Sequence, residues 1–123
     1  MAWLRRLIAV GLLGTMLVLV PAASEGRTPF TYHAKCIGGC HWSPFFKSVS
    51  RGKKIIWKNS SGRFHNVVSF RGHWMKLRNL PVGASTSRRF WKHGVYHFRC
   101  TLHSTLINGV CHGMCGKIKV RRT

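Results

Sequence analysis

Residues 94–120 constrain the fold of this chain more than any other part of its sequence. Residues 95–100 alternate between two faces, and the apolar face ends in Cys100. This period of two predicts a half-buried β-strand with the Cys100 thiol on its apolar side. We expect the strand to open into a loop at His103, Met114 to close that loop, and residues 117–121 to form a final alternating strand.

Cys100, His103 and Met114 would bring a thiolate, an imidazole and a thioether onto one strand–loop–strand unit. Soft sulfur donors combined with imidazole suit copper better than hard cations. The set lacks one imidazole, and His65 is the residue that offers it.

The first two dozen residues have the three-part layout of a secretory signal. A short segment with two arginines precedes an apolar run over residues 7–20, and small residues follow it. This run is shorter than the roughly 18 residues expected of a membrane span. We predict a signal peptide over residues 1–24, and one domain over residues 25–123 in a secreted or periplasmic protein.

The chain is strongly basic, with 21 Lys and Arg against a single acidic residue, Glu25. Without the two arginines of the signal, the formal charge is about +18, which predicts attraction to anionic partners. These include acidic envelope polymers, anionic lipids and an acidic protein. A solvated basic surface with no docking role is the alternative.

Five cysteines in an exported chain favour two disulfides and one remaining thiol. Cys36/Cys40 and Cys111/Cys115 are close pairs, whereas Cys100 is isolated and in phase with the core. Local pairing and pairing between the two segments are both open. A zinc site built from these four cysteines with the adjacent His41 and His112 is a weaker alternative in this compartment.

Short strands separated by turn signals, without a helical period, predict an all-β sandwich or barrel of about seven strands. Ile55 and Trp57 share the inner face of one strand, and residues 64–70 form another. Residues 27–44 are expected to be loop-rich, and residues 71–79 irregular. The remaining histidines are interpreted as surface or strand-edge residues: His33, His41, His73, His93 and His97.

Four segments in this order give the chain a resemblance to the cupredoxin family of plastocyanin- and azurin-like blue copper proteins. The resemblance implies a Greek-key β-sandwich that holds one copper ion at one end, with His65, Cys100, His103 and Met114 as ligands. It also implies that Asn66 ties the His65 loop to the Cys100–Thr101 backbone. The segments are SVSRGKKIIWKN, FHNVV, LPVGASTSRRFWKHGVYHFRCTLH and GMCGKIKV.

The sequence departs from plastocyanin-like members in the ten residues, 104–113, between His103 and Met114. His112 lies in this segment and is the alternative to Met114 as the fourth ligand. Since Gly113, Met114 and Gly116 lead directly into the last strand as in the family, Met114 is preferred.

The resemblance implies a non-enzymatic, monomeric carrier of single electrons, with copper cycling between Cu(I) and Cu(II). His103 would be the port for electrons, ringed by Leu102, Leu106 and Ile107. The basic surface would steer the protein to a redox partner with an acidic docking surface, and we expect no nucleic-acid partner. Two alternatives are a copper carrier or buffer, and a cationic envelope-binding protein with a structural metal.

Overall fold

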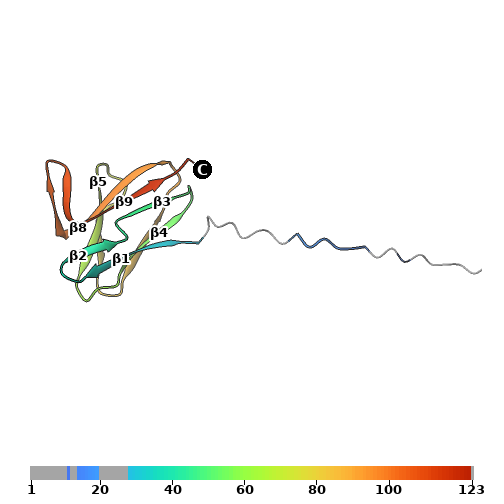
Figure 1. Cartoon of the computed structure of the whole chain (residues 1–123), viewed down its shortest axis with the longest axis horizontal. Helices are drawn as coiled ribbons and strands as arrows, with labels where there is room; N and C mark the ends of the chain where they lie inside the picture. The colour runs from blue at the N-terminus through green and yellow to red at the C-terminus, as the bar shows by residue number, and fades with distance from the viewer. Residues whose placement is uncertain (1–10, 12–13, 20–27, 123) are drawn as a thin grey trace, which may run out of the picture.

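The computed structural model describes residue 11, residues 14–19 and residues 28–122, and its described part is all-β (Figure 1). Nine strands form a two-layered sandwich, where about seven were predicted. They are β1 (Phe30–Cys36), β2 (Cys40–Ser43), β3 (Phe46–Val49), β4 (Lys54–Asn59), β5 (His65–Phe70), β6 (Arg78–Leu80), β7 (Ser85–Arg89), β8 (Gly94–Ile107) and β9 (Val110–Val120).

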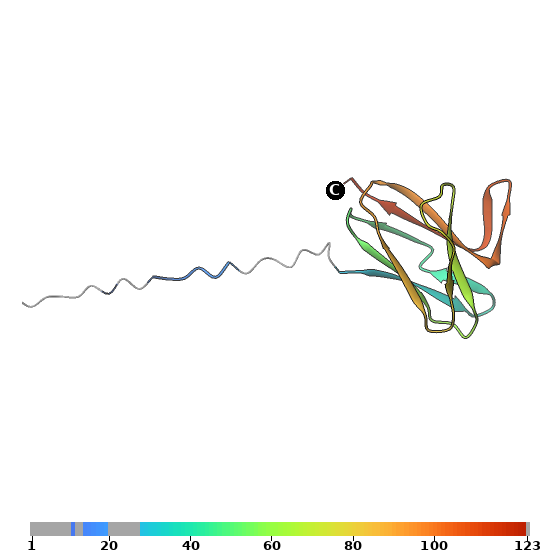
Figure 2. The ribbon, with the colours of Figure 1, turned by 180° about the vertical axis from the view of Figure 1, so that it is seen from behind.

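The strands make two mixed sheets, in the orders β2-β1-β4-β7 and β3-β9-β8-β5-β6. β1 pairs with β4, and β3 with β9, in parallel, while the other pairs are antiparallel. Seen from both sides, the two layers face each other along most of their length (Figure 2). The predicted all-β sandwich is therefore confirmed.

The prediction of a loop-rich segment over residues 27–44 is wrong, because β1 and β2 form a hairpin there. Tyr32 and Ala34 alternate along β1 and are fully buried, so the strand contributes directly to the core. Gly38 and Gly39 make the turn, both with positive φ, as residues without Cβ readily do. This turn brings β2 back alongside β1, and the prediction from sequence missed both strands.

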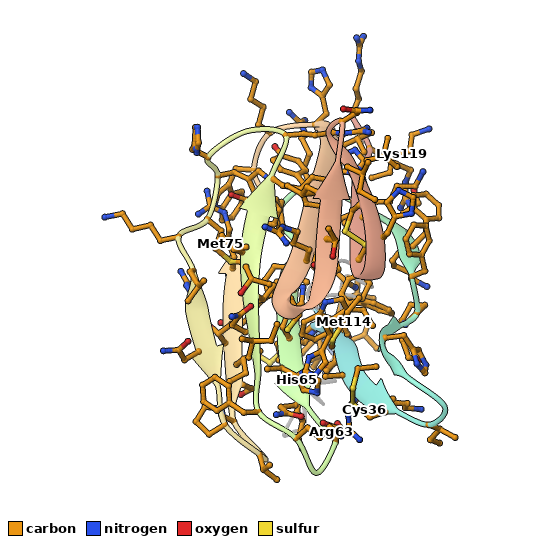
Figure 3. All side chains as sticks on the ribbon, turned by 90° about the vertical axis from the view of Figure 1, so that its left-hand side faces the viewer. Cys36, Arg63, His65, Met75, Met114 and Lys119 are labelled. Atoms are coloured by element: carbon orange, nitrogen blue, oxygen red, sulfur yellow. A yellow bond between two sulfur atoms is a disulfide. The ribbon has the colours of Figure 1, made fainter. Side chains whose placement is uncertain are left out.

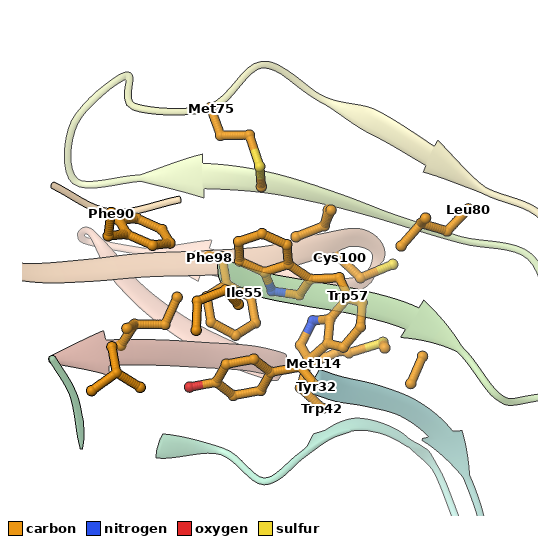
Figure 4. Packing of buried hydrophobic residues seen from close by; sticks show 14 of the residues in the cluster. Tyr32, Trp42, Ile55, Trp57, Met75, Leu80, Phe90, Phe98, Cys100 and Met114 are labelled. Carbon is orange, nitrogen blue, oxygen red and sulfur yellow. The ribbon is translucent and has the colours of Figure 1, made fainter. Parts of the chain in front are cut away.

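The core between the sheets is dominated by aromatic rings, including Tyr32, Trp42, Trp57 and Phe98 (Figure 4). Phe98 meets the rings of the other three edge to face, with centroids 4.8 to 5.8 Å apart. The Tyr32 hydroxyl donates a hydrogen bond of 3.0 Å to the Lys117 carbonyl of β9, in the opposite sheet. These contacts hold together the two sheets, one of which carries the candidate ligands.

Residues 104–113 form the outer part of a long hairpin rather than the predicted loop. β8 and β9 continue past the sandwich and pair as far as Ile107 and Val110, and the hairpin projects at one end of the molecule (Figure 1). Asn108 and Gly109 make its two-residue turn, both with positive φ, a geometry that matches the twist of antiparallel strands.

The predicted signal segment, residues 1–24, lies mostly outside the described residues, so that segment and the boundary after Ser24 stay predictions. Among the residues that the structure describes, no helix is long and apolar enough to cross a membrane.

Candidate metal centre

Three of the predicted ligands meet at one end of the sandwich. The Nδ1 atoms of His65 and His103 are 3.1 Å apart, and the Cys100 Sγ atom lies 3.7 and 3.6 Å from them. His65 and Cys100 are fully buried, whereas His103 is half-buried. A point equidistant from the three atoms lies about 2 Å from each, close to the length of a metal–imidazole bond.

An irregularity in β8 allows Cys100 and His103 to reach the same point. Residues three apart on a regular strand lie on opposite faces. The register between β8 and β9 shifts between Arg99 and Ser104, as at a β-bulge, which re-aims the side chains within it. Because β5 pairs with β8, His65 at the start of β5 completes the group from the neighbouring strand.

Asn66 ties the two ligand-bearing strands together, as its predicted role required. Its side chain accepts a hydrogen bond of 2.7 Å from the Thr101 backbone N–H and donates one of 2.7 Å to the Thr101 hydroxyl. Its own backbone N–H points at Cys100 Sγ, at 3.4 Å. Asn66 thus fixes the spacing of β5 and β8 and directs a donor at the candidate thiolate, which disperses negative charge on sulfur.

The outer side of His65 is held by Ser61 and Asn59, which the prediction from sequence did not include in the site. Its Nε2 atom lies 2.7 Å from the Ser61 Oγ atom, and Ser61 donates in turn to the Asn59 side-chain oxygen at 2.8 Å. Asn59 is buried and donates to the backbone carbonyls of Arg63 and Leu80. A proton on Nε2, donated to Ser61, leaves Nδ1 bare and aimed at Cys100.

The pKa of His65 in this metal-free arrangement is lowered from its ordinary value. Burial is the largest cause, followed by the nearby His103 and Arg63. All three disfavour a second proton on the ring. His65 is therefore held as a neutral imidazole, the form that can donate a lone pair to a metal.

Met114, on β9, is fully buried in the core cluster that also contains Cys100 (Figure 4). Figure 3 shows Met114 and His65 at the same end of the sandwich, with Lys119 toward the other. His112 is exposed on the hairpin, where it pairs with Thr105, and it does not join the cluster of the described residues. This arrangement favours Met114 over His112 as the fourth donor.

Gly113 keeps β9 close to His103. A Cβ atom added at Gly113 would lie 2.4 Å from the His103 carbonyl oxygen, and its φ of 100° is itself one that side chains rarely adopt. Met114 is the next residue, so this backbone contact fixes where Met114 begins relative to His103.

Both disulfides are local. Cys36 pairs with Cys40 and Cys111 with Cys115, leaving Cys100 as the free cysteine of the described chain. The cysteines of the zinc alternative are thus bound to each other. Cys36 Sγ lies 3.4 Å from His65 Nε2, so the first disulfide covers the outer edge of a candidate ligand.

The other histidines remain at the surface or strand edges, as predicted. His41, His73 and His93 are exposed, while His33 and His97 are half-buried and outside the metal-ligand cluster. His97 lies on the opposite face of β8 from Cys100, where its ring stacks at a tilt against Phe70 with centroids 5.4 Å apart.

The sandwich has counterparts among solved structures, although no protein-family model and no curated protein matches the sequence. A purple cupredoxin from Nitrosopumilus maritimus has a TM-score of 0.58 and 22% identity over 75% of this chain and 99% of that one. Amicyanin from Paracoccus versutus has a TM-score of 0.57 and 19% identity over 83% and 85% of the two chains. A copper-containing nitrite reductase from Thermus scotoductus matches at a TM-score of 0.57 and 17% identity, over 78% of this chain but 23% of its own.

These likenesses show that the chain has the cupredoxin fold, as its resemblance to that family predicted. At these levels of sequence identity they establish the fold alone.

Proposed function

We propose that this protein binds one copper ion through His65, Cys100, His103 and Met114 and carries single electrons between redox partners. The observation that carries the proposal is the compact, largely buried triangle of two imidazole nitrogens and one thiol sulfur. Its dimensions suit bonds to a metal of copper or zinc size.

The chemistry of the donors favours copper. Two imidazoles and a cysteine thiolate with a weak thioether donor are the set found in electron-transfer copper sites, while structural zinc sites usually have four strong donors. When bound, copper would supply one-electron chemistry by alternating between Cu(I) and Cu(II). The Cys100 thiol would give up its proton to become a ligand.

The protein would contribute a frame that keeps the ligands in place in both oxidation states. Asn66 holds β5 to β8, Ser61 orients the His65 ring, and Gly113 allows β9 to lie against His103. A site whose ligands are already positioned changes little when an electron arrives or leaves, and exchange is then fast.

His103 would be the port for electrons, since it is the least buried of the three clustered ligands. Leu102, Leu106, Ile107 and Val110, on the same strands, are 39 to 56% exposed. This apolar surface suits close contact with a partner, and the basic remainder of the protein would steer an acidic partner toward it.

The test is a titration of the purified protein with Cu(II), followed by its visible spectrum. We expect an intense thiolate-to-copper band that saturates at one equivalent and is lost in Cys100→Ser. His97→Ala is the matched control, since it removes an imidazole from the other face of β8 and should leave the band intact. A band that persists in Cys100→Ser, or weak absorption in the unaltered protein, would contradict the proposal.

Measuring two rates then distinguishes a function in electron transfer from one in copper delivery. We expect rapid self-exchange of electrons between oxidised and reduced protein, and slow loss of copper to a chelator. Slow exchange together with ready transfer of copper to a metal-free acceptor would instead identify a copper carrier.

We also propose that the protein is exported, on the strength of the signal-like layout of residues 1–24. Expression in a bacterium, followed by fractionation and mass measurement, should give an extracytoplasmic chain that begins at Glu25. A full-length chain confined to the cytoplasm would contradict this.

A further inference from the structure

A small cavity of about 220 Å³ lies on the outer face of the β3-β9-β8-β5-β6 sheet, near the base of the long hairpin. His97 and Lys117, which are cross-strand neighbours on β8 and β9, line one side of it. Phe45, Phe70, Arg71 and the Cys111–Cys115 disulfide complete most of the wall. The cavity is separate from the candidate metal centre, whose Cys100 points into the core from the other face of β8.

The charged part of this wall is basic and has no acidic counterpart. Arg71 reaches across to the Gly109 carbonyl at the hairpin tip, 3.5 Å away, and Lys117 lies 5.5 Å from the centre of the Phe46 ring. Glu25, the single acidic side chain of the sequence, lies outside the described residues. No carboxylate side chain in the described part of the chain is therefore available to neutralise these cations.

The protonation of His97 is affected by these neighbouring cations. Its pKa is lowered first by burial and then by the neighbouring Arg71 and Lys117. The ring is therefore neutral at physiological pH and can donate a hydrogen bond from one nitrogen. Two cations and one neutral donor around a hollow are the surroundings that an anion prefers.

The rest of the wall is largely apolar, which favours a ligand with an apolar body over a bare inorganic ion. The Phe70 ring packs against His97, and Phe45 is 56% exposed at the rim. Pockets for drug-sized ligands occupy roughly 300–1,000 Å³. A cavity below that range takes a ligand with about one ring or a short chain.

We propose that this cavity binds a small organic carboxylate. The carboxylate group would lie between Arg71 and Lys117, within reach of His97, and the apolar body would lie against Phe70 and Phe45. A planar, bidentate partner such as a carboxylate matches the guanidinium of Arg71 better than a point charge would.

Metal-free protein is used for the test, so that the result does not depend on copper binding. Benzoate is the probe, and binding is followed by calorimetry and by the NMR signals of the His97 ring and the Gly116 amide. We expect saturable binding at one site, with both signals shifting along the same curve. Benzamide, the neutral isostere, and inorganic phosphate, which lacks the apolar body, should each bind at least about tenfold more weakly.

Variants assign the site. Arg71→Gln and Lys117→Gln should each weaken benzoate binding by about tenfold or more, the loss expected for one charge-assisted hydrogen bond. Arg89→Gln is the matched control: Arg89 also donates to a glycine carbonyl, that of Gly52, but on the other sheet. It removes the same charge and should leave the affinity unchanged.

Three outcomes would overturn the proposal. Equal affinity for benzoate and phosphate would mean ion pairing only, and equal affinity for benzoate and benzamide would mean apolar contact only. An equal effect of Arg89→Gln and Arg71→Gln would mean that net charge, rather than this cavity, attracts the anion. Lys117→Gln provides a second assignment should Arg71→Gln disturb the hairpin.

Discussion

Replacing Gly113 by alanine tests whether the contact between β9 and His103 sets the candidate metal centre. The new Cβ atom would lie 2.4 Å from the His103 carbonyl oxygen and 3.2 Å from the Ser104 Cα atom. Both are backbone atoms, so no flexible side chain can move aside, and one strand must shift. Since Met114 follows Gly113 directly, the shift would move a proposed ligand.

Gly109→Ala is the matched control. Gly109 also has a positive φ, of 75°, on the same hairpin, but a Cβ atom there would meet no atom within 4 Å. The control therefore carries the backbone penalty alone, about 1 to 2 kcal/mol for a side chain in a left-handed conformation. Gly113→Ala should lose a further 1 to 3 kcal/mol or so, the usual cost of forcing extra atoms into a packed region.

The free energy of unfolding is measured by urea titration of both metal-free variants, and the copper spectrum is recorded for each. We expect Gly113→Ala to lose more stability than Gly109→Ala, and to alter the charge-transfer band while the control keeps it. If the two variants lose equal stability and both keep the band, then the close approach of β9 to His103 does not position the site, and the reasoning is refuted.

Three further predictions concern the surroundings of the site. Ser61→Ala removes the partner of His65 Nε2 and should lower copper affinity about 10- to 100-fold in a competition titration, as loss of an outer-shell hydrogen bond usually does; unchanged affinity would contradict this. Met114→Leu keeps the apolar volume but removes the thioether. Voltammetry of the copper-loaded protein should show a reduction potential raised by about 60 mV, which corresponds to a tenfold change in the relative affinities for Cu(II) and Cu(I). His112→Ala is the control and should not shift the potential. The pKa of His97 is lowered in the folded protein, so below about pH 6.5 the unfolded chain binds more protons and the free energy of unfolding falls. Urea titrations of metal-free protein should show a smaller fall for His97→Gln than for the unaltered protein. An identical pH dependence of the two would refute the assignment.

Much of the fold and two of the three clustered residues, Cys100 and His103, followed from local patterns. The alternation that ends in Cys100 was sufficient to place the Cys100 thiol in the core, and Cys100 is indeed fully buried. The pairing of Asn66 with Thr101 was also predicted, but only through the resemblance to a known family. Such a pair joins residues 35 positions apart, and no local pattern reveals it.

The errors arose where polar or sulfur-containing residues occupy strands. β1 was missed although Tyr32 and Ala34 alternate, because the intervening residues and the nearby glycines weaken the signal. The outer hairpin was taken for a loop, although Asn108-Gly109 between apolar residues is a strong local hairpin signal. The prediction of a loop made no use of that signal.

Ser61 and Asn59 were missed for a different reason. Their positions in a turn are predictable, but their role depends on where the His65 ring lies in three dimensions. A serine in a turn usually bonds the nearby backbone, and nothing in the sequence distinguishes one that orients a ligand.

The positions of the two disulfides bear on why local pairing is useful here. In the chain-entropy model, closing a loop of five residues stabilises a protein by about 2 kcal/mol, while a loop from Cys36 to Cys111 would contribute about 4.5 kcal/mol. Local pairs are thus the weaker choice for global stability. Each of them instead lies beside a candidate ligand: Cys36 Sγ is 3.4 Å from His65 Nε2, and Cys111 and Cys115 span Met114. The first disulfide therefore lies against the ring of His65, and the second restrains the segment that carries Met114, so both local pairs bear on the geometry of the site.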